Sequence, residues 1–184
     1  LALSRDKRVA EATDAIEASL VLRRRQFGPD AVATATSQIN LANLLALSGR
    51  FDEAEAHMDA GIRTYRTAYG EHHNQYAWSL RRLATLRMRQ GRSDAAVEDL
   101  LLRSLAISTQ SQGEDSVDVS ETLNALAAFS LAQMRIDAAV DYQQRVVAYC
   151  QRVYGDDSPM TQTTTLGLAA LHVRQGALDR GQDL

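Results

Sequence analysis

The chain has 184 residues, of which 45% are hydrophobic and 23% charged, and its formal net charge at pH 7 is −3. Such a chain is too apolar to be disordered, and its small negative charge gives no reason to expect nucleic acid as a partner. The single cysteine, Cys150, excludes an intramolecular disulfide framework and favours a reducing, cytoplasmic location. No apolar run is long enough to span a membrane and no segment resembles a signal peptide, so no membrane partner is expected.

Two series of turns recur along the chain with the same spacing. The first series contains glycines at intervals of 42, 43 and 42 residues, namely Gly28, Gly70, Gly113 and Gly155. The second series contains aspartates at the same intervals, namely Asp52, Asp94, Asp137 and Asp179. Because both series share the one irregular interval, the sequence predicts a tandem array of a single structural unit.

The segments between these turns predict helices, because they are rich in Ala, Leu, Arg, Gln and Glu and have no internal proline. A first helix is expected over residues 8–27. After it, each unit contains an A helix followed by a B helix. The A helices are expected over 31–48, 73–90, 116–133 and 158–175, and the B helices over 51–69, 93–112 and 136–154. A last B helix is expected to begin at Asp179.

The expected fold is all-α, with antiparallel helix pairs stacked as an α-solenoid. One apolar column lies on the A helices, at Leu41, Leu83, Leu126 and Leu168, and a column of small residues lies on the B helices, at Ala12, Ala54, Ala96 and Ala139. No single pair can bury both columns, so neighbouring pairs must stack. The single array is divided into a partial repeat 1–27, repeats 28–69, 70–112 and 113–154, and a last repeat 155–184 holding an A helix and the start of a B helix. The incomplete end repeats predict that the chain is a piece of a longer array.

Two local departures from the repeat have structural consequences. One extra residue lies between Ala96 and Arg103, where either a π-bulge or a tolerated insertion is expected, the insertion being favoured. Met134 replaces the glycine between two helices, and we expect that turn to avoid the left-handed conformation.

The helix pairs resemble tetratricopeptide repeats of the longer, kinesin-light-chain type. The resemblance rests on Leu-Ala in helix A, Gly between the helices and Ala early in helix B, and on pieces of the longer motif: Asn40-Leu41-Ala42, Leu123-Asn124, His73, Pro159 and Arg103-Ser104-Leu105. It implies a right-handed superhelix whose A helices line a concave groove, and a role as a protein-interaction scaffold. It also implies that the second Asn of the family's Leu-Asn-Asn-Leu-Ala motif, here Asn40, holds the backbone of a bound peptide; Arg82, Ala125 and Gly167 occupy that position in the other repeats.

The candidate binding site is the groove, and the second A helix is its most distinctive part. That helix carries Trp78 together with Arg81, Arg82, Arg87 and Arg89. Guanidinium groups bind carboxylates and phosphates through paired hydrogen bonds, so one hypothesis is that the groove binds an acidic or phosphorylated peptide around Trp78 and Arg82. In the alternative, Trp78 packs between repeats and the arginines are solvated and paired with acids such as Glu121. The predicted groove residues are Asn40, Asn43, Trp78, Arg81, Arg82, Thr85, Arg89 and Asn124.

No catalytic, metal or cofactor site is predicted, and the chain is not expected to be an enzyme. His72 and His73 lack a further ligand at helical spacing and are expected to cap a helix, and Cys150 is expected to pack in the interior. The favoured function is a non-catalytic scaffold that binds a peptide or a partner helix. The alternative is a regulatory or sensor segment of a larger bacterial signalling protein with its chemistry elsewhere. Self-association through the end repeats is a further alternative.

Overall fold

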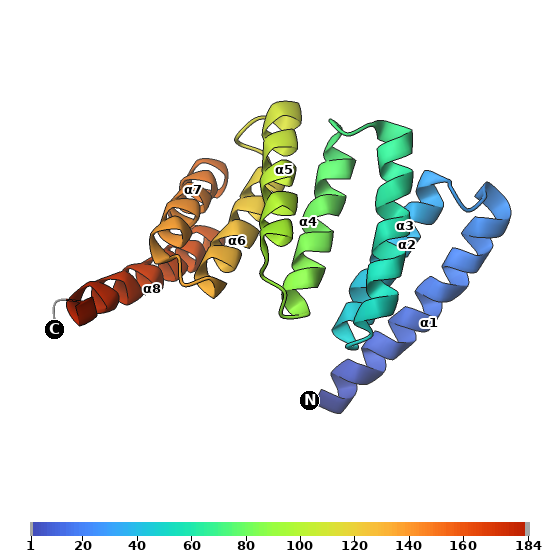
Figure 1. The fold of residues 1–184 in the computed structure, drawn as a ribbon, viewed down its shortest axis with the longest axis horizontal. Helices are drawn as coiled ribbons and strands as arrows, with labels where there is room; N and C mark the ends of the chain where they lie inside the picture. Colours follow the sequence, from blue (N-terminus) through green and yellow to red (C-terminus); the bar gives the residue numbers. More distant parts are fainter. Residues whose placement is uncertain (1, 183–184) are drawn as a thin grey trace. The chain divides into compact units, whose positions relative to one another are not determined.

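The computed structural model describes the backbone of residues 2–182 and the side chains of residues 7–176. Over these residues the chain forms eight α-helices and no strand, in the order predicted (Figure 1). The helices are α1 (Ala2–Phe27), α2 (Val32–Leu47), α3 (Phe51–Tyr69), α4 (Asn74–Arg89), α5 (Ala95–Gln112), α6 (Val117–Ala132), α7 (Ile136–Tyr154) and α8 (Pro159–Gln182). The prediction of an all-α fold is therefore confirmed.

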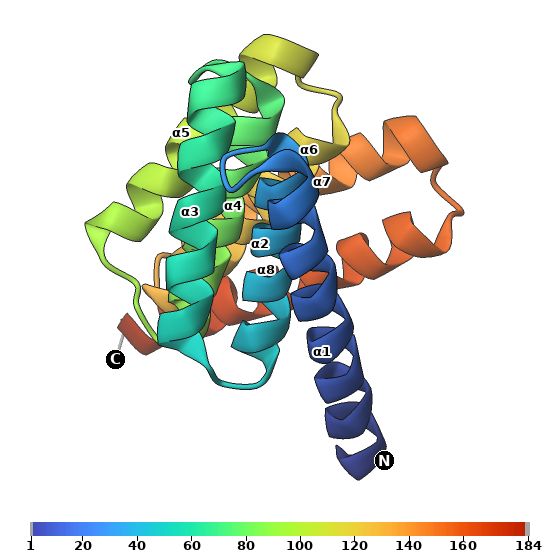
Figure 2. The same ribbon diagram turned by 90° about the vertical axis from the view of Figure 1, so that its right-hand side faces the viewer.

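The helices form two compact units, Leu1–Arg92 with α1 to α4 and Ser93–Leu184 with α5 to α8. Within each unit every helix packs against the next one along the chain, and in the first unit α2 also contacts α4. Figures 1 and 2 both show α1, α2 and α3 side by side. The boundary between the units falls inside the predicted repeat 70–112, between its two helices.

The predicted leucine column on the A helices is buried in three of its four positions. Leu41, Leu83 and Leu126 lie in the interior of their units, and the alanines that follow the first two are fully buried. Leu168 is only half-buried and Ala169 is exposed, because among the described residues α8 packs against α7 alone.

Small residues allow α3 to approach α2 very closely. Ala54 and Gly61 are both buried on α3. A Cβ atom at Gly61 would lie 2.5 Å from Cγ1 of Ile39 and 3.2 Å from the carbonyl oxygen of Ala35. Since Ile39 is itself fully buried, its side chain has little room to move away. The glycine therefore sets the distance between the two helices.

The extra residue near Ala96 is accommodated in a turn, and the π-bulge, the less favoured of the two expected alternatives, does not form. The α5 helix is regular from Ala95 to Gln112, and the connection that precedes it is longer than the corresponding one before α3. As a result Ala96 is exposed, while Val97 is fully buried at the place that Ala54 and Ala139 occupy in their helices. The insertion is absorbed where no helical hydrogen bond has to be broken.

Met134 adopts the conformation that we expected it to avoid. Its φ is 57°, close to the values of 75° and 80° at Gly49 and Gly91 in the equivalent turns. The backbone N–H of Met134 donates to the carbonyl of Leu131, and that of Arg135 donates to Ser130 at 2.8 Å, as at the end of the other A helices. These bonds, and the return of α7 against α6, hold a non-glycine residue in a conformation that costs about 1–2 kcal/mol.

The ends of the described chain also differ from expectation. The α1 helix begins at Ala2 rather than near residue 8, and α8 continues to Gln182 without the turn that was expected at Gly176. Asp179 therefore lies within α8 and does not begin a separate helix. In the α2–α3 and α6–α7 pairs the second helix packs back against the first, and among the described residues no such helix follows α8.

We predict that Gly61→Ala destabilises the protein. The gain in helix propensity of up to about 1 kcal/mol is outweighed by overpacking, which typically costs about 1–3 kcal/mol. Chemical unfolding of the chain measures the difference. Gly167→Ala is the matched control, because its Cβ would meet only Nε2 of Gln143, at 3.7 Å. The control should be neutral or stabilising, and Ile39→Val should relieve part of the Gly61→Ala defect; equal effects at both glycines would contradict the packing argument.

We also predict that Met134→Gly stabilises the protein by about 1 kcal/mol, because glycine adopts the left-handed conformation without a steric penalty. The methionine side chain is 61% exposed, so its removal sacrifices little burial. Thermal unfolding should show a higher midpoint for Met134→Gly and a lower one for Gly91→Ala. A lower midpoint for Met134→Gly would show that its side chain contributes more than the backbone strain removes.

Candidate functional site

The free faces of α2 and α4 carry aligned side chains in the first unit. Four positions of α2 recur 42 residues later in α4, and all eight side chains are half-buried or exposed. Because α2 and α4 contact one another, these positions form one continuous surface, which we call the A-helix face. Its members pair as Thr36 with Trp78, Asn40 with Arg82, Asn43 with Thr85, and Leu47 with Arg89.

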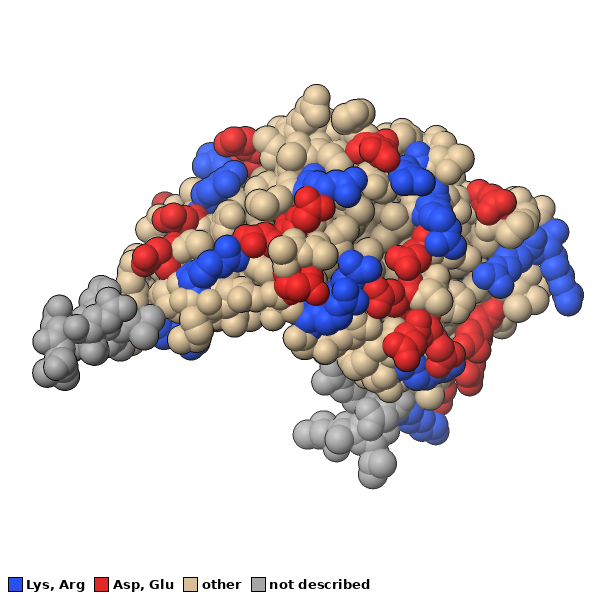
Figure 3. Space-filling view, viewed as in Figure 1, with Lys and Arg blue, Asp and Glu red and all other residues tan. Residues whose placement is uncertain are grey.

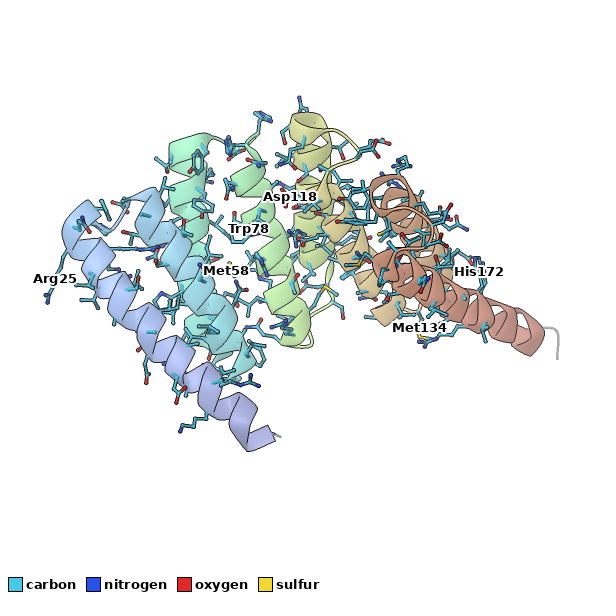
Figure 4. All side chains as sticks on the ribbon, turned by 180° about the vertical axis from the view of Figure 1, so that it is seen from behind. Arg25, Met58, Trp78, Asp118, Met134 and His172 are labelled. Atoms are coloured by element: carbon cyan, nitrogen blue, oxygen red, sulfur yellow. The ribbon has the colours of Figure 1, made fainter. Side chains whose placement is uncertain are left out.

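Arg82 and Trp78 contact one another on this face. They lie one turn apart on α4, and the Arg82 guanidinium carbon is 5.0 Å from the centre of the Trp78 ring. Both side chains are half-buried, so the cation–π contact is partly shielded from water. Shielding from water strengthens a cation–π contact. Figure 4 shows Trp78 on the side of α4 that faces α2 and α3.

The ring of Tyr65 on α3 packs against the ring of Trp78. The two ring centres are 6.4 Å apart with planes tilted by 45°. The Tyr65 hydroxyl lies 2.9 Å from that of Thr36, whose own hydrogen goes to the carbonyl of Val32. Tyr65 is therefore the donor to Thr36. Burial raises the pKa of Tyr65.

The aromatic contacts continue from Tyr65 to the start of α4. Tyr69 lies 5.7 Å from Tyr65, and its ring is stacked on that of His73 with centres 4.4 Å apart. His73 precedes α4, and its Nδ1 accepts a hydrogen bond from the backbone N–H of Gln75. The prediction that this histidine caps a helix is confirmed.

Two of the four arginines predicted beside Trp78 are not available on the A-helix face. Arg81 is buried, with 7% of its surface exposed, because a shift of one residue turns a side chain by about 100° around a helix. Arg87 forms an ion pair with Glu55 of α3, with an N–O distance of 2.7 Å. Arg82 and Arg89 lie at positions of the A-helix face.

Glu55 is the acid that neutralises this side of α4. Partial burial raises its pKa, but hydrogen bonds and charges from Arg87, Gln90 and Arg92 outweigh that effect, and the net pKa is lowered. The Glu55 and Arg87 side chains are each about one-fifth exposed, so the pair is partly shielded from solvent.

The predicted asparagines divide between the two units. Asn40 is exposed and Asn43 half-buried on the A-helix face. Asn124 lies on α6 of the second unit, where it borders a cavity of about 220 Å³ together with Gly167 and Leu171. The positions of α6 and α8 equivalent to the A-helix face hold mainly small residues, including Ala125, Ala128, Gly167 and Ala170, and carry no comparable aromatic group.

The structure places the lone cysteine and the candidate metal ligands of the described residues apart from one another. Cys150 is a free, buried thiol packed among Val119, Leu123, Val146 and Tyr149, as predicted. Among the residues described, no three His, Cys, Asp or Glu side chains come together as metal ligands. Likewise, none of the described helices is both long and apolar enough to cross a membrane. Figure 3 shows basic and acidic side chains interspersed on the face in view.

Tyr65 and Glu55 are the site residues that the sequence analysis missed. Both belong to α3, whereas the search for binding residues was confined to the A helices. Tyr65 aligns with Ser108 and Cys150 in the repeat, and a large aromatic group in a column of small side chains was the signal that could have identified it.

A family model for the tetratricopeptide repeat matches residues 1–66, 34–110 and 118–180. Among solved structures, BtubC (BKLC) from P. vanneervenii is similar with a TM-score of 0.78 and 19% identity, over 98% of this chain and 71% of that one. A kinesin-light-chain-like protein with nearly identical TPR-like repeats from Podosopora anserina is similar with a TM-score of 0.76 and 18% identity, over 97% and 84%. A point variant of that protein gives a TM-score of 0.77 and 19% identity, over the same shares. No curated protein matches the chain.

We predict that Glu55→Gln lowers stability at neutral pH by roughly 1 kcal/mol, as expected for a partly exposed ion pair. Because folding lowers the pKa of Glu55 from its ordinary value of 4.5, its contribution is present above that pH and is lost as the pH falls through the folded pKa. Unfolding curves across this range should therefore converge for wild type and Glu55→Gln in acid. Glu71→Gln is the control, since Glu71 is exposed and 3.8 Å from Arg66; a gap that persists in acid would contradict the assignment.

Proposed function

Because the chain belongs to the tetratricopeptide repeat family, whose repeats generally mediate protein–protein interaction, we propose that it is a non-catalytic module that binds a peptide segment of a partner protein along the A-helix face. The single observation that carries the proposal is the contact between Arg82 and Trp78 on that face. An amphipathic aromatic group beside a guanidinium group is the combination most often found at the energetic centre of protein interfaces.

The support behind Trp78 makes it a suitable anchor. Tyr65 contacts the ring on one side, and the hydrogen bond from Tyr65 to Thr36 limits how far Tyr65 can move. A side chain held in place loses less conformational entropy when a ligand binds. Trp78 thus packs between two predicted repeats, as the alternative interpretation expected, and still keeps an exposed part for a ligand.

The charge of the A-helix face favours an acidic partner. Two of its eight side chains are arginines, Arg82 and Arg89, and none is acidic. Arg89 is exposed and forms no ion pair with any described residue. A peptide with a carboxylate or phosphate near Arg89 would complement its charge through charge-assisted hydrogen bonds.

Asn40 and Asn43 give the same face its hydrogen-bonding groups. Neither carboxamide is bonded to a described side chain or backbone group, and both present donors and acceptors to solvent. By resemblance to the family motif, Asn40 is the residue that would hold the backbone of the peptide. The arginines would then select peptides with acidic side chains, and the asparagines would bind the peptide backbone whatever the sequence of the peptide.

The reducing setting inferred from Cys150 fits this proposal. The single cysteine is a free thiol packed in the interior. Free thiols are typical of proteins from compartments that keep thiols reduced, so we propose that the interaction takes place in the cytoplasm. The proposed partner is a protein, with nucleic acid and membranes not involved.

We predict that Arg82→Glu weakens binding of an acidic peptide by roughly tenfold or more, because it removes a charge-assisted hydrogen bond and adds repulsion. The probe is a fluorescent heptapeptide in which Glu alternates with Leu, measured by fluorescence anisotropy. Trp78→Ala should produce a comparable loss. The same peptide with Gln in place of Glu should bind weakly to the wild-type chain.

Arg145→Glu is the matched control, because Arg145 is exposed on α7 and the substitution changes the net charge equally. It should leave binding unchanged at moderate salt, where long-range charge effects are screened. Equal losses for Arg82→Glu and Arg145→Glu would show that net charge alone attracts the peptide. Binding unaffected by both Arg82→Glu and Trp78→Ala would contradict the proposed site.

A further inference from the structure

A second cavity lies in the first unit, away from the A-helix face. It has a volume of about 480 Å³ and opens between the turn that joins α1 to α2, α2 itself and the C-terminal half of α3. Its principal lining residues are Pro29, Asp30, Gln38, Arg63, Thr64 and Ala68. Gln38 is two residues before Asn40 on α2, which places it about 200° around the helix from the proposed peptide site.

Gln38 forms the buried wall of this cavity without a protein partner. Its side chain is 5% exposed. Among the described residues nothing forms a hydrogen bond with its carboxamide, and its Oε1 is shielded from solvent. A buried polar group left unsatisfied costs about 1–3 kcal/mol, and most such groups in proteins have a partner. The carboxamide therefore has unused capacity for a hydrogen bond to a group outside the described residues.

Thr64 of α3 also lines the cavity. It is 7% exposed, and no described residue accepts or donates a hydrogen bond at its hydroxyl. Other threonines of this unit are bonded: Thr34 donates to the carbonyl of Gly28, and Thr67 donates to that of Arg63. Two buried side chains with unused hydrogen-bonding capacity thus line the same cavity.

Arg63 and Asp30 add opposite charges to the lining. Both are exposed, and neither forms an ion pair within the described part of the chain. Asp59, one turn before Arg63, is influenced by its charge but does not bond to it. The charges cancel, so the cavity suits a ligand that carries an anionic group beside an N–H donor.

We infer that this cavity binds a small molecule with an α-carboxylate and an N–H group on the adjacent carbon, either a free α-amino acid or the C-terminal residue of a short peptide. Arg63 binds the carboxylate through its paired donors. Gln38 and Thr64 bind the N–H and any neighbouring amide, since the Gln38 carboxamide can turn either its oxygen or its nitrogen toward the ligand. Asp30 binds the ammonium group of a free amino acid.

The test uses the full chain and three probes: L-alanine, trialanine, and trialanine with an amidated C-terminus. Two-dimensional NMR follows backbone amides and the side-chain NH₂ of Gln38 during titration up to about 10 mM, which covers weak binding of small ligands. We expect L-alanine or trialanine to shift the Gln38 signals and those of residues around Arg63, and amidation to abolish the effect. Binding of L-alanine alone identifies the free amino acid as the ligand; binding of trialanine as well identifies the peptide terminus.

Arg63→Gln should weaken binding of the preferred probe roughly tenfold or more, as loss of a charge-assisted pair predicts. Arg66→Gln is the control, because Arg66 lies on the same helix but does not line the cavity. Gln38→Leu should abolish binding without lowering the unfolding temperature of the unliganded chain, since it removes an unsatisfied carboxamide. Absence of shifts with all three probes, or equal binding of the amidated peptide, would overturn the inference and leave a cavity that holds only water.

Discussion

The close approach of α3 to α2 at Gly61 is the constraint on which the first unit depends. The space between Gly61 and Ile39 has no room for a Cβ atom, so α3 lies in one position against α2. One helical turn further along α3, that position brings Tyr65 to Thr36 and beneath Trp78. Three residues after Gly61, it brings Thr64 to the cavity that Gln38 lines. The proposed peptide site and the proposed small-molecule site are therefore on two sides of the same helix contact.

Charge on α4 is arranged by its contact with α3 rather than by its own sequence. Four arginines lie within nine residues of α4, and without their surroundings they suggest a strongly basic surface. Glu55 pairs with Arg87, and the interior takes up Arg81. The A-helix face carries two arginines, an aromatic group and two asparagines, and under our proposal this mixture favours selective binding of a peptide over general attraction of anions.

The two units are built from the same repeat but carry different side chains at the aligned positions of their A helices. On α2 and α4 the aligned positions of the A-helix face, apart from Leu47, are polar or aromatic, whereas on α6 and α8 most of them are alanine or glycine. The buried columns are shared by both units, because the packing of one helix on the next requires them. The free face is under no such requirement, and its variation is what allows a helical array to carry a specific site in one part only.

Repetition alone was enough to predict the helices, their order and most of the buried columns, because each turn and each apolar position recurs in several copies and errors in one copy are corrected by the others. The burial of Leu41, Leu83 and Leu126 followed directly from this spacing. Departures from the repeat could not be resolved in the same way. Whether the extra residue near Ala96 lay in a helix or a turn, and whether Met134 would adopt a left-handed conformation, depended on hydrogen bonds and on the return of the following helix. The tertiary structure alone decided that Trp78 and Arg87 contact residues of α3, and that Oε1 of Gln38 has no partner among the described residues. These contacts depend on the distance and rotation between neighbouring helices, which no spacing in the sequence encodes.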